Sequence, residues 1–156
     1  HDPLGRLVHV RDGIERLLRS RLCASTPAQL GYLAGLEGDR GWMEIYAKKV
    51  LKQRDHCLKR ISTIDGLEVE RPGGAFYMFI RLTDRAWASN DKQFVLDLLH
   101  EEHVLLVHGS GFSPHRGKGH VRLVYLADVS VLDEAFDRID RFLNRHRQAG
   151  ITEMDS

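Results

Sequence analysis

The sequence has little of what marks secreted, membrane or nucleic-acid-binding proteins. It holds two cysteines among 156 residues, which is too few for a disulfide framework. No apolar run approaches the roughly 18 residues of a membrane span, and no charged-then-apolar leader precedes the first helical pattern. Lys and Arg (23) nearly balance Asp and Glu (22), so the net charge of +1 provides no field that attracts nucleic acid or an anionic membrane. We expect a soluble, cytoplasmic protein with neither kind of partner.

Several catalytic signatures are missing as well. There is no G-x-S-x-G nucleophile elbow. The nine histidines are irregularly spaced and no set of cysteines or carboxylates completes a metal site, so no metal is expected. Cys23 and Cys57 lie near apolar helix positions without a paired histidine, which predicts buried thiols rather than nucleophiles.

The length and the hydrophobic content, 156 residues and 42%, fit one globular domain. The chain opens without an initiator Met and reaches a helical pattern within a few residues. This start favours a cut segment, although an expression scar is equally compatible.

Three helices are predicted in the first part of the chain. Residues 26–29 (TPAQ) form a capping box with proline at the first helical position and start the second helix. The first, amphipathic helix is predicted over residues 12–23, with the apolar positions Ile14, Leu17, Leu18 and Leu22. The third is predicted over residues 40–61, with the apolar stripe Trp42, Ile45, Tyr46, Val50, Cys57, Leu58 and Ile61.

The pattern then changes to that of strands. Residues 67–70 alternate, residues 72–74 break the chain and residues 75–82 are typical of an aromatic-rich strand, which together predict a hairpin. Two more strands are predicted over residues 104–107 and 121–126.

Two further helices complete the expected fold. Asn90 is the predicted cap of one, which buries Phe94, Val95, Leu98 and Leu99. Ser130, with Asp133, starts the last, whose stripe is Leu132, Phe136, Ile139 and Leu143. Grouped helices and strands of this kind predict an α+β fold in which helices cover a small mixed β-sheet.

Arg122 is the most informative residue. In residues 120–126 (HVRLVYL) the period of two puts Arg122 on one face of the predicted strand, beside Val124 and Leu126. A guanidinium among apolar neighbours is costly to desolvate unless it pairs with a carboxylate or phosphate, and its planar fork suits bidentate carboxylate binding. The residues leave two interpretations open: a structural ion pair or a strand end that reaches water, and an anion-binding site.

The glycine-rich residues 109–119 invite comparison with phosphate-binding loops. Such loops need a helix directly after the glycines, so that its N–H groups face the phosphate. Here a predicted strand follows. A flexible connection that lines a site is therefore favoured over a phosphate cradle.

With these segments in place, the chain resembles the C-terminal part of class I aminotransferases of the pyridoxal-phosphate fold-type I superfamily, in the aspartate/alanine aminotransferase group. The matching stretches are residues 21–29 (RLCASTPAQ), 71–79 (RPGGAFYMF), 107–112 (VHGSGF) and 119–123 (GHVRL). They stand in family order at family-like spacing. Each is modest alone, but the ordered set is specific.

The resemblance implies a substrate-binding role for Arg122, because the matching arginine of the family binds the α-carboxylate of the amino-acid substrate. It also implies that the small domain closes over the cofactor when substrate binds. The residues that it places near the cleft are Gly73, Gly74, Gly109, Ser110, Gly111 and Phe112.

The family's Schiff-base lysine, and the arginine that binds the cofactor phosphate, lie N-terminal to the segment that this chain matches. The resemblance therefore implies pyridoxal phosphate in the intact parent enzyme but no catalytic residue in this chain. We expect the isolated chain to be inactive and to bind the cofactor weakly or not at all. The implied partners are amino-acid and 2-oxo-acid substrates, the missing large cofactor-binding domain and a second subunit of a homodimeric parent.

The resemblance divides the chain into residues 1–38, an interdomain helix and helix-turn segment, and residues 39–156, the small domain. The rival hypothesis is a stand-alone module that binds a carboxylate or complements a separate cofactor domain without catalysis, and a third is a structural remnant without a ligand. The identity of the amino donor stays open. So does the role of Arg19 and Arg21, for which a solvated face is favoured over a second carboxylate site.

Overall fold

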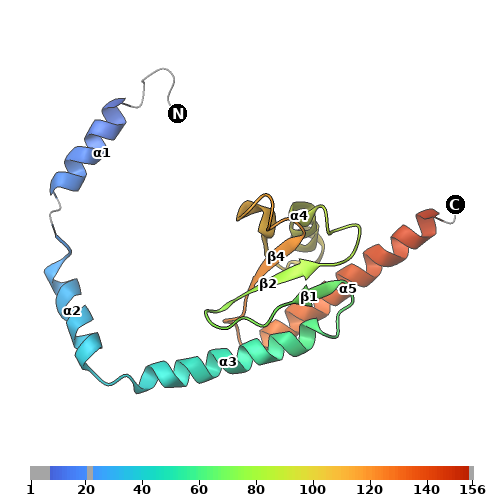
Figure 1. Cartoon of the computed structure of the whole chain (residues 1–156), viewed down its shortest axis with the longest axis horizontal. Coiled ribbons are helices and arrows are strands. Elements are labelled where there is room, and N and C mark those ends of the chain that lie inside the picture. The colour runs from blue at the N-terminus through green and yellow to red at the C-terminus, as the bar shows by residue number, and fades with distance from the viewer. Residues whose placement is uncertain (1–7, 21–22, 155–156) are drawn as a thin grey trace. The chain divides into compact units, whose positions relative to one another are not determined.

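The protein's structure is a computed structural model that describes residues 8–20 and 23–154, with side chains described up to residue 148 (Figure 1). The chain divides into two compact units, His1–Glu44 and Ile45–Ser156. The division of the parent protein after residue 38 remains a prediction.

The first unit holds α1 (Val8–Ser20) and α2 (Thr26–Glu37), and neither buries a described side chain. The amphipathic α1 is confirmed, and Ile14, Leu17 and Leu18 form an exposed apolar face on it; the predicted Leu22 lies outside the described residues. The predicted buried thiol is wrong for Cys23, which is exposed after the end of α1.

The capping box predicted at residues 26–29 is wrong in its geometry. Ser25 holds the N-cap position, so Thr26 is already helical, and no side chain donates or accepts a cap hydrogen bond. Gln29 instead donates from Nε2 to the carbonyl oxygen of Ala24 at 2.8 Å. The helix start was predictable from its proline, but the hydrogen-bond pairing was not.

Helix α3 (Gly41–Ile61) has the predicted extent to within one residue, but only its C-terminal half is packed. Cys57 and Ile61 are buried as predicted, whereas the stripe prediction is wrong for Trp42, Ile45 and Tyr46, which are exposed. The packed half faces α5 (Val129–Met154), to which it is joined by ion pairs from Arg60. Burial raises the pKa of the Cys57 thiol to about 12, which keeps that cysteine in its unreactive, protonated form.

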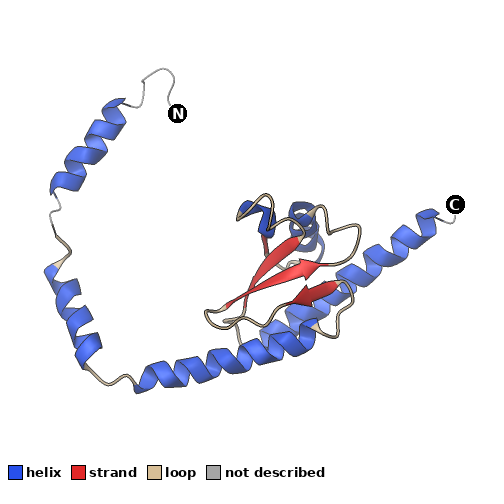
Figure 2. Ribbon diagram, viewed as in Figure 1, coloured by secondary structure: helices blue, strands red, loops and turns tan. Residues whose placement is uncertain are grey.

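The strands form one four-stranded sheet in the order β1-β2-β4-β3 (Figure 2). They are β1 (Leu67–Val69), β2 (Tyr77–Leu82), β3 (Val107–His108) and β4 (His120–Val124). The α+β class and the hairpin are confirmed. The mixed sheet is wrong, because every pairing is antiparallel: β1-β2 and β3-β4 are hairpins, and β2 also runs antiparallel to β4. Of the strand predicted over residues 104–107, only Val107 is in a strand.

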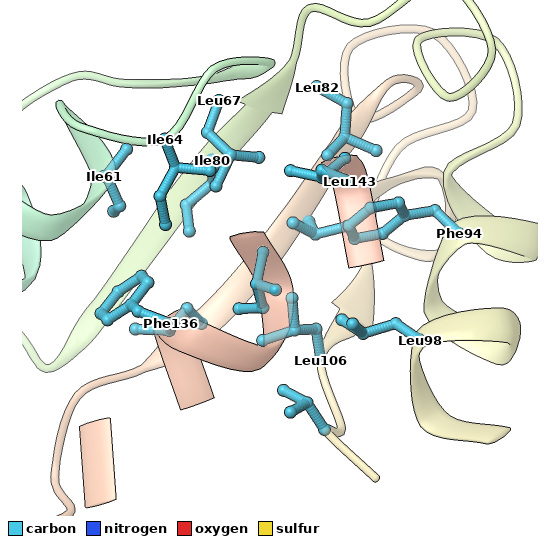
Figure 3. Close-up of a cluster of buried hydrophobic side chains, with 14 of the residues drawn as sticks. Ile61, Ile64, Leu67, Ile80, Leu82, Phe94, Leu98, Leu106, Phe136 and Leu143 are labelled. Atoms are coloured by element: carbon cyan, nitrogen blue, oxygen red, sulfur yellow. The ribbon is translucent and has the colours of Figure 1, made fainter. Parts of the chain in front are cut away.

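One face of this sheet carries the hydrophobic core. Met78, Ile80 and Leu82 alternate inward along β2, and Val121 and Leu123 do so on β4. Figure 3 shows Ile80 and Leu82 close to residues of the covering helices. The predicted inward residues Leu132, Phe136, Ile139 and Leu143 of α5 are all buried, as are Phe94, Val95 and Leu98 of α4 (Asp91–Glu102). Leu99, also predicted to be buried, is only partly so.

Both helix-start predictions in this unit need correction. Asn90 precedes α4 as predicted, but its side chain makes no cap hydrogen bond. Helix α5 begins at Val129, so Ser130 stands inside the first turn rather than before it. The core stripe is fixed by packing across several turns, whereas one residue at a helix end changes little in that packing.

Candidate carboxylate-binding site

Arg122 stands at the centre of the sheet, on the face opposite the core. It is paired with Phe79 of β2 on one side and Val107 of β3 on the other. Phe79 and Val107 are 41% and 37% exposed, which shows that this face is open in the described chain. The predicted alternation of Arg122 with buried neighbours is confirmed, since Val121 and Leu123 turn to the core.

The guanidinium of Arg122 lies against two aromatic rings. Its Cζ is 4.7 Å from the centre of the Tyr77 ring and 4.5 Å from that of Phe112. Cations at such distances are attracted by the negative face of an aromatic ring, by about 0.5–2 kcal/mol depending on desolvation. Phe112 was among the predicted cleft residues; Tyr77 was not, although it follows the Gly73 to Phe76 stretch on the outward period of β2.

No carboxylate accompanies Arg122 in the described part of the chain. Its Nε is fully buried and has no hydrogen-bond partner, and no ion pair from Arg122 is found among these residues. The neighbouring strand offers a contrast, because Arg81 on the same face pairs with Glu68. Arg122 therefore has no ion-pair partner among the described residues, and it lies in the middle of β4 (His120–Val124) rather than at its end.

This isolation has an energetic consequence. A buried charged donor without an acceptor costs about 1–3 kcal/mol or more, whereas charge-assisted hydrogen bonds to a carboxylate return about 1.5–3 kcal/mol each. The aromatic neighbours offset part of the cost but accept no conventional hydrogen bond. The buried Nε of Arg122 would therefore gain from a hydrogen-bond acceptor, and most from an anionic one.

The glycine-rich segment 109–119 forms a closed loop beside this site. It opens with a short 3-10 turn, Gly109–Gly111, and its two arms touch, because a Cβ on Gly117 would collide with the carbonyl oxygen of Gly109. The loop then enters β4, as predicted. Backbone atoms fill the space between the glycines, which agrees with the preference against a phosphate cradle.

Asp91 holds this loop, a role that the sequence did not reveal. Asp91 is only 3% exposed, and a carboxylate oxygen accepts a hydrogen bond from the Ser110 N–H at 2.8 Å. Burial opposes the ionisation of Asp91, but hydrogen bonds from Ser110 and the backbone of Gly119 outweigh it, so its pKa lies below the ordinary value. An acid in the first turn of a helix is so common that it gave no signal.

The predicted cleft residues do not all lie together. Ser110, Gly111 and Phe112 belong to the loop beside Arg122, whereas Gly73 and Gly74 line an apolar pocket with Val50 and Tyr125. Their role at a cleft stays a prediction. Within the described residues no group of histidine, cysteine and carboxylate side chains could hold a metal ion, and no helix has the length and apolar character to cross a membrane.

Comparison with known proteins decides the family. A family model described as aminotransferase class I and II matches residues 8–139. The chain belongs to this aminotransferase family. It is 37% identical over 140 residues to the glutamate-pyruvate aminotransferase AlaA of Haemophilus influenzae, and this match covers 88% of the chain and 34% of that protein.

Other aminotransferases agree with this assignment. The chain is 34% identical to the alanine aminotransferase of Mycobacterium tuberculosis over 88% of its own length and 32% of that enzyme. It is similar to the solved structure of the alanine aminotransferase from Pyrococcus furiosus, with a TM-score of 0.77 and 45% identity over 92% of the chain and 36% of that structure. The chain thus spans about one third of the aminotransferases that it matches. The resemblance to fold-type I aminotransferases is confirmed.

The family implies pyridoxal phosphate in the parent enzymes. That cofactor is held as an imine by a lysine that is desolvated or otherwise activated. The lysines of this aminotransferase chain do not fit that requirement, because all six are exposed, and Lys49 pairs with Asp128 at 3.4 Å. They are Lys48, Lys49, Lys52, Lys59, Lys92 and Lys118.

Proposed function

We propose that the chain is the C-terminal domain of an amino-acid:2-oxo-acid aminotransferase and that Arg122 binds the substrate's α-carboxylate. The observation that carries this proposal is the unpartnered, aromatic-flanked guanidinium at the centre of an open sheet face. The glutamate-pyruvate and alanine aminotransferases among the relatives act on substrates that share an α-carboxylate, which supports it. The parent is proposed to be a cytoplasmic homodimer.

The geometry suits a clamp. A guanidinium presents its N–H donors in a plane, which matches the two oxygens of a carboxylate. The backbone of Arg122 is fixed on both sides by β2 and β3, so little conformational freedom is lost when a ligand binds. The rings of Tyr77 and Phe112 restrict water near the charge and so strengthen its attraction for an anion. The chain would thereby fix the substrate's α-carbon, and closure of this domain would exclude water from the site.

The test is binding of pyruvate and 2-oxoglutarate to the 156-residue chain, measured by ligand-observed NMR. We expect dissociation constants on the order of millimolar, since one clamp supplies only about 4 kcal/mol. Arg122→Gln should weaken both ligands at least tenfold, because a neutral amide loses the charge-assisted hydrogen bonds.

Arg81→Gln is the matched control for this experiment. It removes an arginine from the same face of the neighbouring strand, but one whose charge is already paired with Glu68. Pyruvamide, which lacks the negative charge, serves as the control ligand. Equal loss in both variants, or undiminished binding to Arg122→Gln, would contradict the proposal.

A further inference from the structure

The carboxylate of Asp91 holds the start of the glycine-rich loop. Ser110, the second residue of that loop, donates its backbone N–H to Asp91 at 2.8 Å. Asp91 itself is fixed at the first residue of α4, whose Phe94, Val95 and Leu98 are anchored in the core. The loop is therefore tied to a rigid element through one buried side chain.

No described cation offers Asp91 a comparable interaction. The nearest is His108, whose Nδ1 lies 3.9 Å away. That nitrogen accepts a hydrogen bond from the Gly111 N–H at 3.1 Å. The Ser110 N–H of the loop thus donates to a buried carboxylate, and an opened loop would leave that carboxylate without this donor.

The same loop carries one of the two rings that flank Arg122. Phe112 follows the 3-10 turn, and its backbone N–H donates to Gly109 at 2.9 Å. Gly109 in turn is packed so closely that a Cβ there would come within 2.9 Å of the Phe79 ring. Since the turn is wedged against β2 and tied to Asp91, the position of Phe112 over the guanidinium depends on the closed loop.

We propose that Asp91 is a positioning residue that holds the Gly109–Gly119 loop closed, so that Phe112 covers Arg122 and raises its affinity for a carboxylate. This inference rests on the proposed role of Arg122. It assigns a site function to a side chain that touches neither substrate nor cofactor, and it predicts energetic coupling between Asp91 and Phe112.

The experiment measures the pyruvate dissociation constant of the full 156-residue chain and four variants, together with their thermal unfolding midpoints. Asp91→Asn keeps the shape but turns an N–H2 group toward loop donors, and we expect about threefold to tenfold weaker pyruvate binding. Phe112→Ala should weaken binding about tenfold, because water would then reach the guanidinium and screen its attraction for the carboxylate. The double variant should bind like Phe112→Ala alone, because the loop then has no ring to position. Asp97→Asn, which alters an outer carboxylate of the same helix that pairs with Gln93, should bind like the unaltered chain.

The coupling separates positioning from general destabilisation, because a merely structural loss would add to that of Phe112→Ala. A folded Asp91→Asn chain with unchanged pyruvate affinity, or additive losses in the double variant, would overturn the inference. Arg122→Gln is measured in parallel. If it still binds pyruvate, the proposed function fails; if it loses binding while Asp91→Asn keeps it, the inference about Asp91 alone fails.

Discussion

The position of Arg122 on its strand could be predicted from the sequence, whereas the residues that contact it could not. The alternation of residues 120–126 was enough to place the guanidinium on one strand face, and the ordered motifs were enough to suggest a carboxylate ligand. Tyr77 and Phe112 reach Arg122 from a neighbouring strand and a loop, and Asp91 acts across 19 residues of chain. Contacts of this kind depend on how the sheet pairs and how the loop closes, which no local pattern specifies.

At the same scale, the exposed lysines lead to a prediction about the cofactor. Because none of the six is buried, none is activated by desolvation, and we expect pyridoxal phosphate to form no stoichiometric imine with the chain. The measurement is an absorbance titration with pyridoxal phosphate at neutral pH, with free lysine as the reference for adventitious imine. A saturable imine band at one equivalent per chain would show that a lysine of this chain serves as the cofactor's anchor.

At the scale of elements, the sequence predicted the periodic faces of helices and strands, but not which parts of those faces a neighbour covers. The hairpin, the α4 face and the α5 stripe were correct because several turns or strand residues carry the same signal. The prediction failed for the N-terminal half of the α3 stripe. Apolar spacing shows that a helix has an apolar face, but it does not show that a neighbour covers that face. The antiparallel pairing of the sheet followed from its two hairpins, of which the second could not be recognised across the long glycine-rich loop.

The closed loop gives an element-scale prediction. Gly117→Ala should destabilise the chain by about 2–3 kcal/mol, because the added methyl group would collide with the Gly109 backbone and force the loop arms apart. Gly73→Ala is the matched control, since a methyl group there meets open space. Urea unfolding midpoints compare the two. A Gly117→Ala chain as stable as Gly73→Ala would mean that the loop is not closed as described.

At the scale of the whole molecule, three carboxylates tie separate elements together. Asp91 joins α4 to the loop. Glu102 of α4 accepts hydrogen bonds from Arg141 and Arg145 of α5. Asp133 of α5 is hydrogen-bonded to His56 and Arg60 of α3. The pKa of Glu102 is lowered first by Arg141 and then by Arg145, and that of Asp133 first by His56 and then by Arg60. Together with Asp91, these groups are more acidic in the folded chain than in the unfolded one.

This difference determines the pH dependence of stability. Unfolded carboxyl groups titrate near pH 4, so the stabilisation from these three groups is fully present above that value and is lost as the pH falls through their lower folded pKa values. We expect the urea midpoint to decline steeply from about pH 4 downward. Glu102→Gln should be less stable at pH 7 and should lose less on acidification. A midpoint that is constant between pH 5 and pH 3 would contradict this account.

The guanidinium of Arg122 can be observed directly. Its buried Nε has no acceptor in the described chain, so its N–H resonance in a side-chain nitrogen-proton NMR spectrum should shift when pyruvate is added and Arg122 gains its anion. Arg122→Lys assigns the signal, and pyruvamide should leave it in place. A saturable shift specific to the carboxylate is the predicted result. A signal that ignores pyruvate, or responds equally to pyruvamide, would contradict the assignment of Arg122 as the substrate-carboxylate clamp.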